Sequence, residues 1–197
     1  VIGVDAETYA AGLEPEPHGR FRYLNENICT LERLPDCDAV IHLAAETHVD
    51  NSIMDPARFM QTNVLGTFHL LELIRAKRNY QMPLLIHIST DEVYGDTPGA
   101  KDASAPLQPS SPYAASKAAA DHLVQAWGRT YHLRYRIIRP SNCYGSRQFP
   151  EKLIPKVVRC LQLGRDIPVH GDGSQQRYWL HVEDCARAIL AVLDNGQ

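Results

Sequence analysis

Two adjacent carboxylates, Asp91 and Glu92, follow Ser89 and Thr90 at the end of the apolar stretch LLIHI. Such a pair can divide acid and base work, because burial and mutual repulsion can keep one carboxyl protonated while its neighbour stays ionised. Further along, Tyr113 and Lys117 have a spacing that places both side chains on one face of a helix. An ammonium beside a phenol lowers the pKa of the phenol, which would make Tyr113 a usable base. These residue types indicate proton transfer.

The elements that must position these residues alternate between strand length and helical period, which is typical of βαβ units and a parallel sheet. We expect strands at 1–5, 39–44, 83–89 and 135–140, helices at 55–79, 112–131, 151–164 and 182–196, and loops at 12–19 and 95–112. Ser111 and Pro112 predict the cap and first turn of the second helix. Open parallel sheets bind ligands at the carboxyl ends of their strands, so Thr90, Asp91 and Glu92 fall where a ligand is expected. The alternative interpretation of these three residues is a helix cap on a surface loop.

The composition is that of an ordinary globular chain: 197 residues, 44% hydrophobic, 22% charged, with a net charge of −3. Lysine and arginine are scattered, which argues against a nucleic-acid partner. No apolar run reaches the roughly 20 residues that span a bilayer and no secretory signal opens the sequence, so we expect a cytoplasmic protein with no membrane contact. The five cysteines form no CxxC pair and the nine histidines no HExxH motif, so no metal is predicted; we expect His42 and His87 in the core.

Six ordered motifs carry a resemblance to a known family. They are HLAAETHVDNSI (42–53), TNVLGT (62–67), ISTDEVYGD (88–96), SPYAASKAAADHLV (111–124), RPSNCYGSRQFPEKLIP (139–155) and IPVHGDGSQQRYWLHVED (167–184). On these motifs the chain resembles the extended short-chain dehydrogenase/reductases, most closely the nucleotide-sugar 4,6-dehydratases of the dTDP-glucose type. The resemblance implies a Rossmann-like doubly wound parallel sheet, with an NAD-binding domain at 1–145 and part of a nucleotide-sugar-binding region at 146–197.

The resemblance also implies a reaction on a nucleoside-diphosphate hexose. Tyr113 would take the proton of the C4 hydroxyl, held by Thr90, while hydride passes from C4 to NAD. Glu92 would remove the C5 proton and Asp91 would protonate the departing C6 hydroxyl. Hydride would then return to C6 and give a 4-keto-6-deoxy sugar, with Lys117 holding the nicotinamide ribose throughout.

The binding residues carry over from the resemblance in two groups. The cofactor group, in addition to Tyr113 and Lys117, comprises Asp5, Thr8, Asn27, Ile28, Leu43, Ala44, Ala45, Thr62 and Cys143. Asp5 ends the first strand, where a carboxylate accepts hydrogen bonds from the ribose and favours NAD over NADP. The nucleotide-sugar group comprises Thr47, Thr90, Asn142, Lys152, Leu153, Pro168, Val169, His170 and Arg177. Arg177 would hold the diphosphate with its planar guanidinium.

Several positions differ from the family pattern and leave alternatives open. Cys143 replaces an asparagine, His170 replaces a tyrosine, and Tyr178 and His181 stand where aspartate and tyrosine are usual. Thymidine is the preferred nucleotide, with uridine as the alternative. Other possibilities are a 4-epimerase or decarboxylase on the same scaffold, whose members commonly lack a carboxylate at the position of Asp91, or a truncated, non-catalytic nucleotide-binding module.

The family opens with a strand and a glycine-rich GxxGxxG turn, which we expect to be missing here, because the sequence starts on what corresponds to the second strand. We therefore expect a piece of a longer enzyme in which two neighbours of the absent strand keep unpaired edges. The family dimerises through two long helices, here 55–79 and 112–131. Phe59, Phe68 or Trp127 could serve that homodimer contact or the core.

Overall fold

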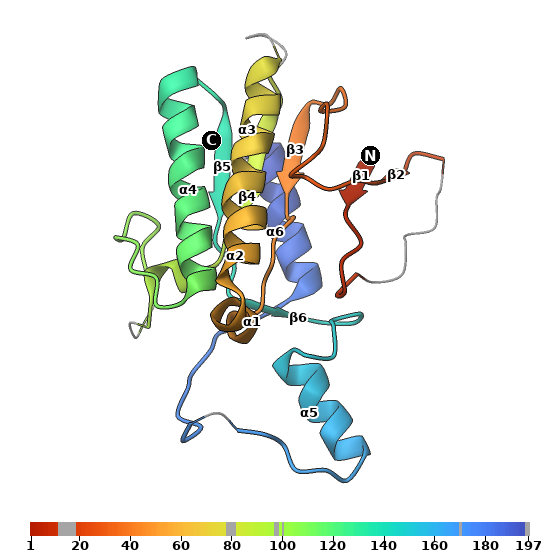
Figure 1. Ribbon diagram of the computed structural model, residues 1–197, viewed down its shortest axis with the longest axis vertical. Helices are drawn as coiled ribbons and strands as arrows, with labels where there is room; N and C mark the ends of the chain where they lie inside the picture. Colours follow the sequence, from red (N-terminus) through yellow and green to blue (C-terminus); the bar gives the residue numbers. More distant parts are fainter. Residues whose placement is uncertain (12–18, 78–81, 97–98, 100, 170, 196–197) are drawn as a thin grey trace.

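The computed structural model describes residues 1–11, 19–77, 82–96, 99, 101–169 and 171–195 (Figure 1). The strands are β1 (Ile2–Asp5), β2 (Arg22–Asn25), β3 (Ala39–His42), β4 (Leu84–Ile88), β5 (Tyr135–Ile138), β6 (Asn142–Tyr144) and β7 (Trp179–His181). The α-helices are α1 (Val49–Met54), α2 (Pro56–Phe59), α3 (Gly66–Ala76), α4 (Pro112–Tyr131), α5 (Leu153–Gln162) and α6 (Val182–Asn195). A π-helix, η1 (Met60–Leu65), joins α2 to α3, and a 3-10 helix, η3 (Asp91–Tyr94), follows β4.

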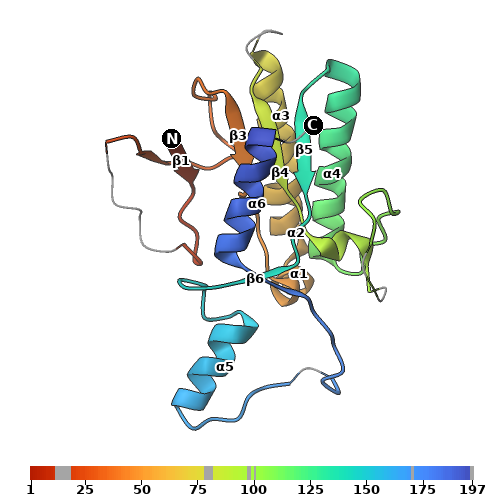
Figure 2. The ribbon, with the colours of Figure 1, turned by 180° about the vertical axis from the view of Figure 1, so that it is seen from behind.

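A three-stranded parallel sheet of order β3-β4-β5 forms the centre of the fold. Its middle strand, β4, carries Leu85, Ile86 and His87, all fully buried. Figures 1 and 2 show α3 and α4 side by side on one face of this sheet and α6 on the other. The parallel α/β architecture predicted from the alternating pattern is therefore confirmed, with β4 and its carboxyl end at the centre.

The first two strands form a separate parallel pair, β1-β2, that lies beside the β3 edge of the central sheet (Figure 1). Among the described strands, β1 pairs with β2 alone and β3 with β4 alone. The apolar side chains of Val4 on β1 and Ile41 on β3 are both exposed. β1 and β3 therefore each keep one edge without a neighbouring strand, as expected from the sequence. The backbone groups along such an edge have no strand partner.

The predicted helix 55–79 is real but not uniform. Pro56 occupies its first turn as predicted, and the chain then passes through the π-helix η1 before α3 ends at Ala76. A π-helix has i→i+5 hydrogen bonds, so its side chains follow a different period from those of an α-helix. The buried side chain of η1 is that of Asn63. A helical period in the sequence cannot reveal this change, so the single-helix prediction was wrong at this point. Residues 78 and 79 lie outside the described ranges.

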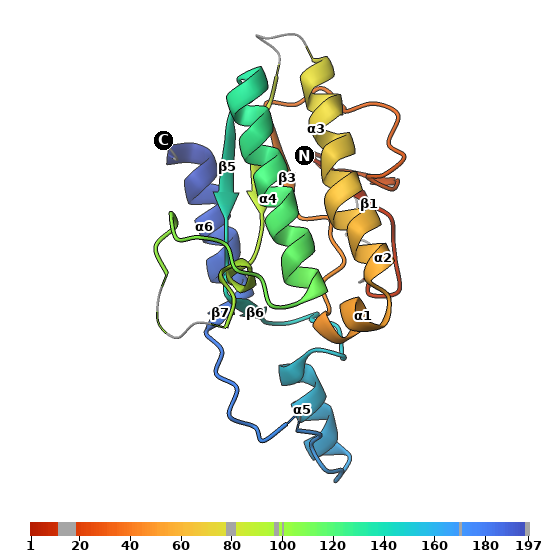
Figure 3. The ribbon, with the colours of Figure 1, turned by 60° about the vertical axis from the view of Figure 1, so that its left-hand side comes forward.

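Helix α4 begins and ends where the sequence indicated. The Ser111 hydroxyl accepts a hydrogen bond from the Ala114 amide at 3.0 Å, and Pro112 is the first helical residue. His132 closes the helix in the left-handed conformation, with φ of 59°. Figure 3 shows α4 running along α3, with its amino end near α1. This places the first turns of α4, which carry Tyr113 and Lys117, at the carboxyl edge of the sheet.

Four short elements were not predicted: β2, α1, β6 and β7. Each is three to six residues long, too short to show a hydrophobic period. The strands predicted at 39–44 and 135–140 end earlier, at His42 and Ile138, as the chain turns into the site. The predicted helix 151–164 shortens to α5, whereas that at 182–196 matches α6 almost fully. None of the helices in the described part is long and apolar enough to cross a membrane.

Candidate active site

The carboxylate pair lies at the carboxyl end of β4, as the sequence predicted. Thr90 is extended and its hydroxyl accepts a hydrogen bond from the Glu92 amide at 3.2 Å, which caps η3. The Asp91 amide donates to the Pro140 carbonyl at 3.1 Å and so ties this turn to the segment after β5. Thr90 therefore does cap a short helix, and the same cap presents Asp91 and Glu92 at the sheet edge.

Burial governs the charge of both carboxyls. It raises the pKa of Asp91, against the opposing effects of the Thr90 hydroxyl and the Arg177 charge. It also raises the pKa of Glu92, and the negative charge of Asp91 raises it further, while Arg177 and Lys152 oppose this. Two neighbouring carboxyls whose ionisation is disfavoured by burial can hold one proton between them. The pair can thus offer an acid and a base at once.

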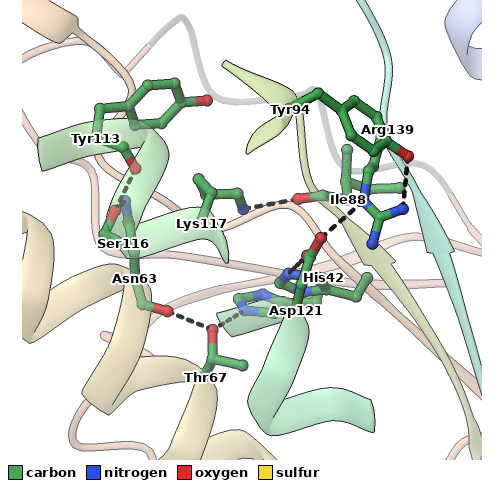
Figure 4. Close-up of polar contacts among 11 residues, drawn as sticks. His42, Asn63, Thr67, Ile88, Tyr94, Tyr113, Ser116, Lys117, Asp121 and Arg139 are labelled. Carbon is green, nitrogen blue, oxygen red and sulfur yellow. Dashed lines mark hydrogen bonds and ion pairs between the residues drawn. The ribbon is translucent and has the colours of Figure 1, made fainter. Parts of the chain in front are cut away.

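Tyr113 and Lys117 share the buried face of α4, with 8% and 3% of their surface exposed. The expectation that Lys117 lowers the phenol pKa was wrong for this structure. Burial raises the pKa of Tyr113, and the charge of Glu92 raises it further, with the Thr90 side chain opposing. The Lys117 ammonium donates to the Ile88 carbonyl at 2.7 Å (Figure 4). Burial lowers the pKa of Lys117 to about 8.

A second set of polar contacts, which the sequence did not reveal, supports the start of α4. The Asn63 amide group donates to the Ser116 hydroxyl at 2.8 Å and to the Glu46 carbonyl at 3.0 Å. Ser116 donates to the Tyr113 carbonyl at 2.7 Å, and Thr67 donates to the Asn63 carbonyl at 2.6 Å (Figure 4). Asn63 lies in the TNVLGT motif, which was the one available signal. These contacts fix η1 against the turn that presents Tyr113.

The nucleotide-sugar residues are only partly brought together. The Lys152 ammonium donates to the Thr47 carbonyl at 3.1 Å and hydroxyl at 3.2 Å. Asn142 begins β6, and its buried side-chain oxygen has no hydrogen-bond partner among the described residues. Arg177 is exposed, yet its charge acts on both Asp91 and Glu92. Of these residues, Lys152 and Arg177 lie close enough to the carboxylate pair for their charges to act on it.

Other members of that set lie elsewhere. Pro168 and Val169 are exposed on the segment between α5 and β7, which runs apart from the sheet edge in Figures 1 and 2. Leu153 opens α5 and is also exposed. His170 is outside the described residues. The predicted contact of these positions with a nucleotide stays a prediction.

The predicted cofactor residues follow the carboxyl ends of successive strands. Asp5 ends β1 and accepts a hydrogen bond from the Glu7 amide at 2.8 Å, and Thr8 is exposed in the loop that follows. Asn27 holds the turn after β2 by accepting from the Cys29 amide at 2.8 Å, and Ile28 is half-buried there.

The remaining cofactor positions follow β3 or lie in η1 and on β6. Leu43 and Ala44 follow β3 and are exposed, Leu43 by 59%, while Ala45 and Thr62 are half-buried. Cys143 lies on β6, where burial and the neighbouring Cys185 thiol raise its pKa to about 12.

This donor set fits a dinucleotide. An exposed carboxylate at Asp5 suits a ribose, the uncovered apolar side chain of Leu43 suits a planar ring or sugar edge, and Tyr113 and Lys117 suit the reactive end. Within the described residues, no group of three His, Cys, Asp or Glu side chains is placed to hold a metal ion.

One pocket, of about 290 Å³, lies outside the predicted residues and is lined by Tyr9, Glu46, Asn51, Met54, Asp55, Arg58 and Phe59. The Asn51 amide donates to the Tyr9 hydroxyl at 2.9 Å, and that hydroxyl donates to the Glu151 carboxylate at 3.2 Å. Arg58 and Glu46 form an ion pair at 2.8 Å. Tyr9 thus connects the loop after β1 with the segment that leads into α5.

Comparison with known proteins gives consistent matches over the whole chain. The family model described as "NAD dependent epimerase/dehydratase family" matches residues 1–197. The dTDP-glucose 4,6-dehydratase of Neisseria gonorrhoeae is 47% identical over 216 aligned residues, which cover 100% of this chain and 62% of the relative. The dTDP-glucose 4,6-dehydratase 1 of Escherichia coli strain K12 is 43% identical, and the alignment again covers 100% of this chain and 62% of the relative. The chain thus spans less than two thirds of the length of these relatives.

Solved structures agree with the sequence matches. The dTDP-glucose 4,6-dehydratase from Streptomyces venezuelae, solved with NAD bound, has a TM-score of 0.90 and 40% identity, covering 100% of this chain and 63% of that one. A UDP-glucuronic acid 4-epimerase from Bacillus cereus, in complex with UDP-glucuronic acid and NAD, has a TM-score of 0.89 and 28% identity, covering 100% and 65%. Dehydratases and epimerases thus share this fold.

Proposed function

Because this chain belongs to the NAD dependent epimerase/dehydratase family, we propose that it forms the NAD-binding and catalytic part of a nucleotide-sugar 4,6-dehydratase. The observation that carries this proposal is the Asp91–Glu92 pair, presented by Thr90 at the end of β4 beside Tyr113. Oxidation of a sugar alcohol needs one base, whereas elimination of water needs a further base and an acid. The pair supplies both.

The side chains divide the work according to their surroundings. Tyr113 takes the proton of the C4 hydroxyl in its ionised form, which burial and the charge of Glu92 disfavour in this structure, and Thr90 holds the C4 oxygen. Glu92 removes the proton at C5, which the 4-ketone has made acidic, and Asp91 gives a proton to the departing C6 oxygen. A C5–C6 double bond forms as water leaves, and Glu92 gives its proton back to C5 when hydride is added at C6. Burial raises the pKa of both Asp91 and Glu92, so the pair can retain the proton that the acid role of Asp91 requires.

NAD is the proposed cofactor, with residues 1–145 as its domain and residues 146–197 as part of the nucleotide-sugar region. When bound, it supplies the oxidation at C4 and the final reduction at C6, so that it is regenerated in each cycle. Asp5 and Thr8 would bind its adenosine, Leu43 and Ala44 would line it, and Lys117 would hold its nicotinamide ribose. The solved relatives with NAD at TM-scores of 0.90 and 0.89 support this assignment.

The preferred substrate is dTDP-glucose, because two relatives named dTDP-glucose 4,6-dehydratase are 43% and 47% identical to this chain. UDP-glucose is the competing substrate. A 4-epimerase is the second candidate function, favoured by the fold of the Bacillus cereus relative. We assign it second because an epimerase has no water to eliminate and therefore no need for an acid and a base beside Tyr113.

The test is incubation of the purified protein with NAD and either dTDP-glucose or UDP-glucose, followed by mass spectrometry of the nucleotide sugar. We expect a product lighter by one water from dTDP-glucose. A product of unchanged mass with inverted C4, identified by NMR, would replace the dehydratase by the epimerase. Absence of any product from both substrates would overturn the catalytic proposal.

A cytoplasmic location and a homodimer complete the proposal. The dimer would form through the exposed faces of α3 and α4, where Phe68 is 42% exposed and its ring meets Trp127 edge-on with centroids 5.8 Å apart. Phe59 belongs to the core, with 1% exposed and its ring against Tyr113. Of the three aromatic residues considered for the contact, Phe68 is the most exposed, Trp127 is half-buried and Phe59 is buried.

A further inference from the structure

A buried ion pair lies directly behind the proposed active site (Figure 4). Arg139, just after β5, donates from Nε to the Asp121 carboxylate at 2.8 Å, and the two side chains are 12% and 0% exposed. Asp121 lies one turn after Lys117 on the buried face of α4. Removing two charges from water is costly, so a pair in this position needs good geometry and further hydrogen bonds.

Arg139 provides those further bonds on its other side. Its Nη1 donates to the Tyr94 hydroxyl at 2.7 Å and to the Ala103 carbonyl at 3.0 Å. Tyr94 is the last residue of η3, the turn that carries Asp91 and Glu92. The guanidinium therefore joins α4, which carries Tyr113 and Lys117, to the carboxylate turn and to the loop beyond it.

The titratable groups that contact Asp121 are His87 of β4 and Arg139 after β5, and the Ser89 side chain also acts on it. His87 of β4 lies 3.4 Å from the Asp121 carboxylate, and burial lowers the pKa of His87, so the imidazole is neutral. Burial acts to raise the pKa of Asp121, but contacts with His87 and Arg139 outweigh it and leave the pKa below its usual value. Asp121 is thus a carboxylate, and its charge is the one opposing the effect of burial on the Lys117 ammonium.

We propose that Asp121 and Arg139 are positioning residues of the reaction. Their ion pair holds the Tyr113–Lys117 face of α4 and the Asp91–Glu92 turn in one fixed relation, and Asp121 supplies the negative charge that faces the Lys117 ammonium. Neither residue belongs to the set predicted to contact the sugar or the cofactor. The positioning role rests on the proposed dehydratase function, whereas the effect of Asp121 on Lys117 can be measured without any substrate.

The first experiment titrates Lys117 by NMR of the protein labelled at lysine Cε. The sequence has five lysines, so the Lys117 signal can be assigned by its loss in Lys117→Arg. We expect a midpoint near pH 8 in the unaltered protein and a midpoint lower by about one unit or more in Asp121→Asn, since one nearby opposite charge shifts a pKa by roughly 1–3 units. An unchanged midpoint in folded Asp121→Asn would overturn the proposal.

The second experiment separates the two roles with Arg139→Lys. Lysine keeps a positive charge for Asp121 but cannot also reach Tyr94 and Ala103. We expect the Lys117 midpoint to stay within about 0.3 units, while the rate of water loss from the sugar falls at least tenfold with KM for the nucleotide sugar within twofold. If KM and kcat fell together, or if the rate of water loss did not fall, Arg139 would not couple α4 to the carboxylate turn in the way proposed.

The control is Asp184→Asn, which removes the carboxylate of the exposed Asp184–Arg187 ion pair on α6. This variant should change neither the Lys117 midpoint nor the rate of water loss. If Asp121→Asn does not fold, the neutral pair Asp121→Asn with Arg139→Gln takes its place, because it leaves no unpaired buried charge. If no substrate reacts, the proposed function fails while the titration still decides the Asp121 effect. If dehydration occurs but the Lys117 midpoint does not move, the positioning inference alone fails.

Discussion

The side chains at the end of β4 decide which reaction this scaffold can perform. Tyr113 alone serves a redox step, whereas Asp91 and Glu92 add the acid and the base of an elimination. We expect the double variant Asp91→Asn, Glu92→Gln to oxidise the sugar at C4 but to lose water at least ~100-fold more slowly, because general acid and base contribute about that much. Mass spectrometry of the sugar and absorbance of reduced NAD would measure the two steps.

A matched control for that variant is Asp96→Asn. Asp96 is exposed just beyond the same turn, and its charge acts on Glu92 only weakly, as the last of several influences. We expect both steps to proceed at close to the unaltered rates in this variant. If the double variant still released water at the normal rate, the carboxylate pair would not be the acid and base.

Lys117 makes the stability of the protein depend on pH. Burial lowers its pKa to about 8, well below the usual value of 10.5, so the folded state binds this proton less tightly than the unfolded state. The stabilisation from the neutral amine is complete above pH 10.5 and is lost as the pH falls through 8. Below pH 8 the buried ammonium costs about 3 kcal/mol, at roughly 1.4 kcal/mol per pKa unit.

The expected consequence concerns Lys117→Met, which keeps the apolar stem and removes the charge. Relative to the unaltered protein, the variant should gain free energy of unfolding at pH 7, and this advantage should shrink between pH 8 and 10.5. Urea unfolding followed by circular dichroism at pH 7 and pH 9.5 measures the difference. Lys101→Met, at an exposed position, is the control, and an equal pH dependence in both variants would refute the assignment to Lys117.

Among the short elements, η3 depends on a glycine. Gly95 ends the turn with φ of 77°, and a Cβ there would lie 2.2 Å from the Gln108 carbonyl oxygen. Gly95→Ala should therefore displace the turn that carries Asp91 and Glu92, lower the free energy of unfolding by about 3 kcal/mol and reduce dehydration. Gly99→Ala is a matched control. Gly99 also has a positive φ, of 85°, but no atom lies within 4 Å of the Cβ that the substitution would add.

The two glycines separate backbone strain from collision. Gly99→Ala should cost only the strain of a left-handed alanine, about 1 kcal/mol, and leave dehydration unchanged. Thermal or urea unfolding of both variants beside an activity assay would test this. Equal losses of stability would show that contact with Gln108 does not hold the turn.

The elements also show what a sequence can reveal and what it cannot. Helix α4 was predictable because Ser111 and Pro112 encode its start locally, and β4 was predictable from its apolar run. The π-helix η1 and the strands β6 and β7 were not, since their form depends on packing partners distant in the chain. The same holds for the site: Asp91, Glu92, Tyr113 and Lys117 form recognisable motifs.

The pairing of Asp121 with Arg139 joins residues of α4 and the segment after β5, and no spacing rule announces it. The pKa of Tyr113 was mispredicted for a related reason. A helical spacing places Lys117 on the same face as Tyr113, but only the folded chain shows the ammonium bonded to the Ile88 carbonyl. Motifs therefore identify the reacting groups, and tertiary contacts set their charges.

The fold as a unit exposes one helical face that a second copy of the chain could cover. α3 and α4 lie side by side on one face of the central sheet (Figure 3). Phe68 of α3 is exposed, and its ring contacts that of Trp127 on α4. α6 covers the opposite face and exposes Leu190 by 53%. If α3 and α4 form the proposed dimer, burying a charge at position 68 would cost several kcal/mol and break it.

We therefore expect sedimentation velocity to give a dimer for the unaltered protein and a monomer for Phe68→Asp, with an unchanged circular dichroism spectrum. Leu190→Asp introduces the same charge at an exposed leucine on the opposite face and should remain dimeric. A monomer at high protein concentration without any substitution would refute the dimer. A dimer lost in Leu190→Asp but kept in Phe68→Asp would place the contact on α6, because only the face buried between two copies is sensitive to a new carboxylate.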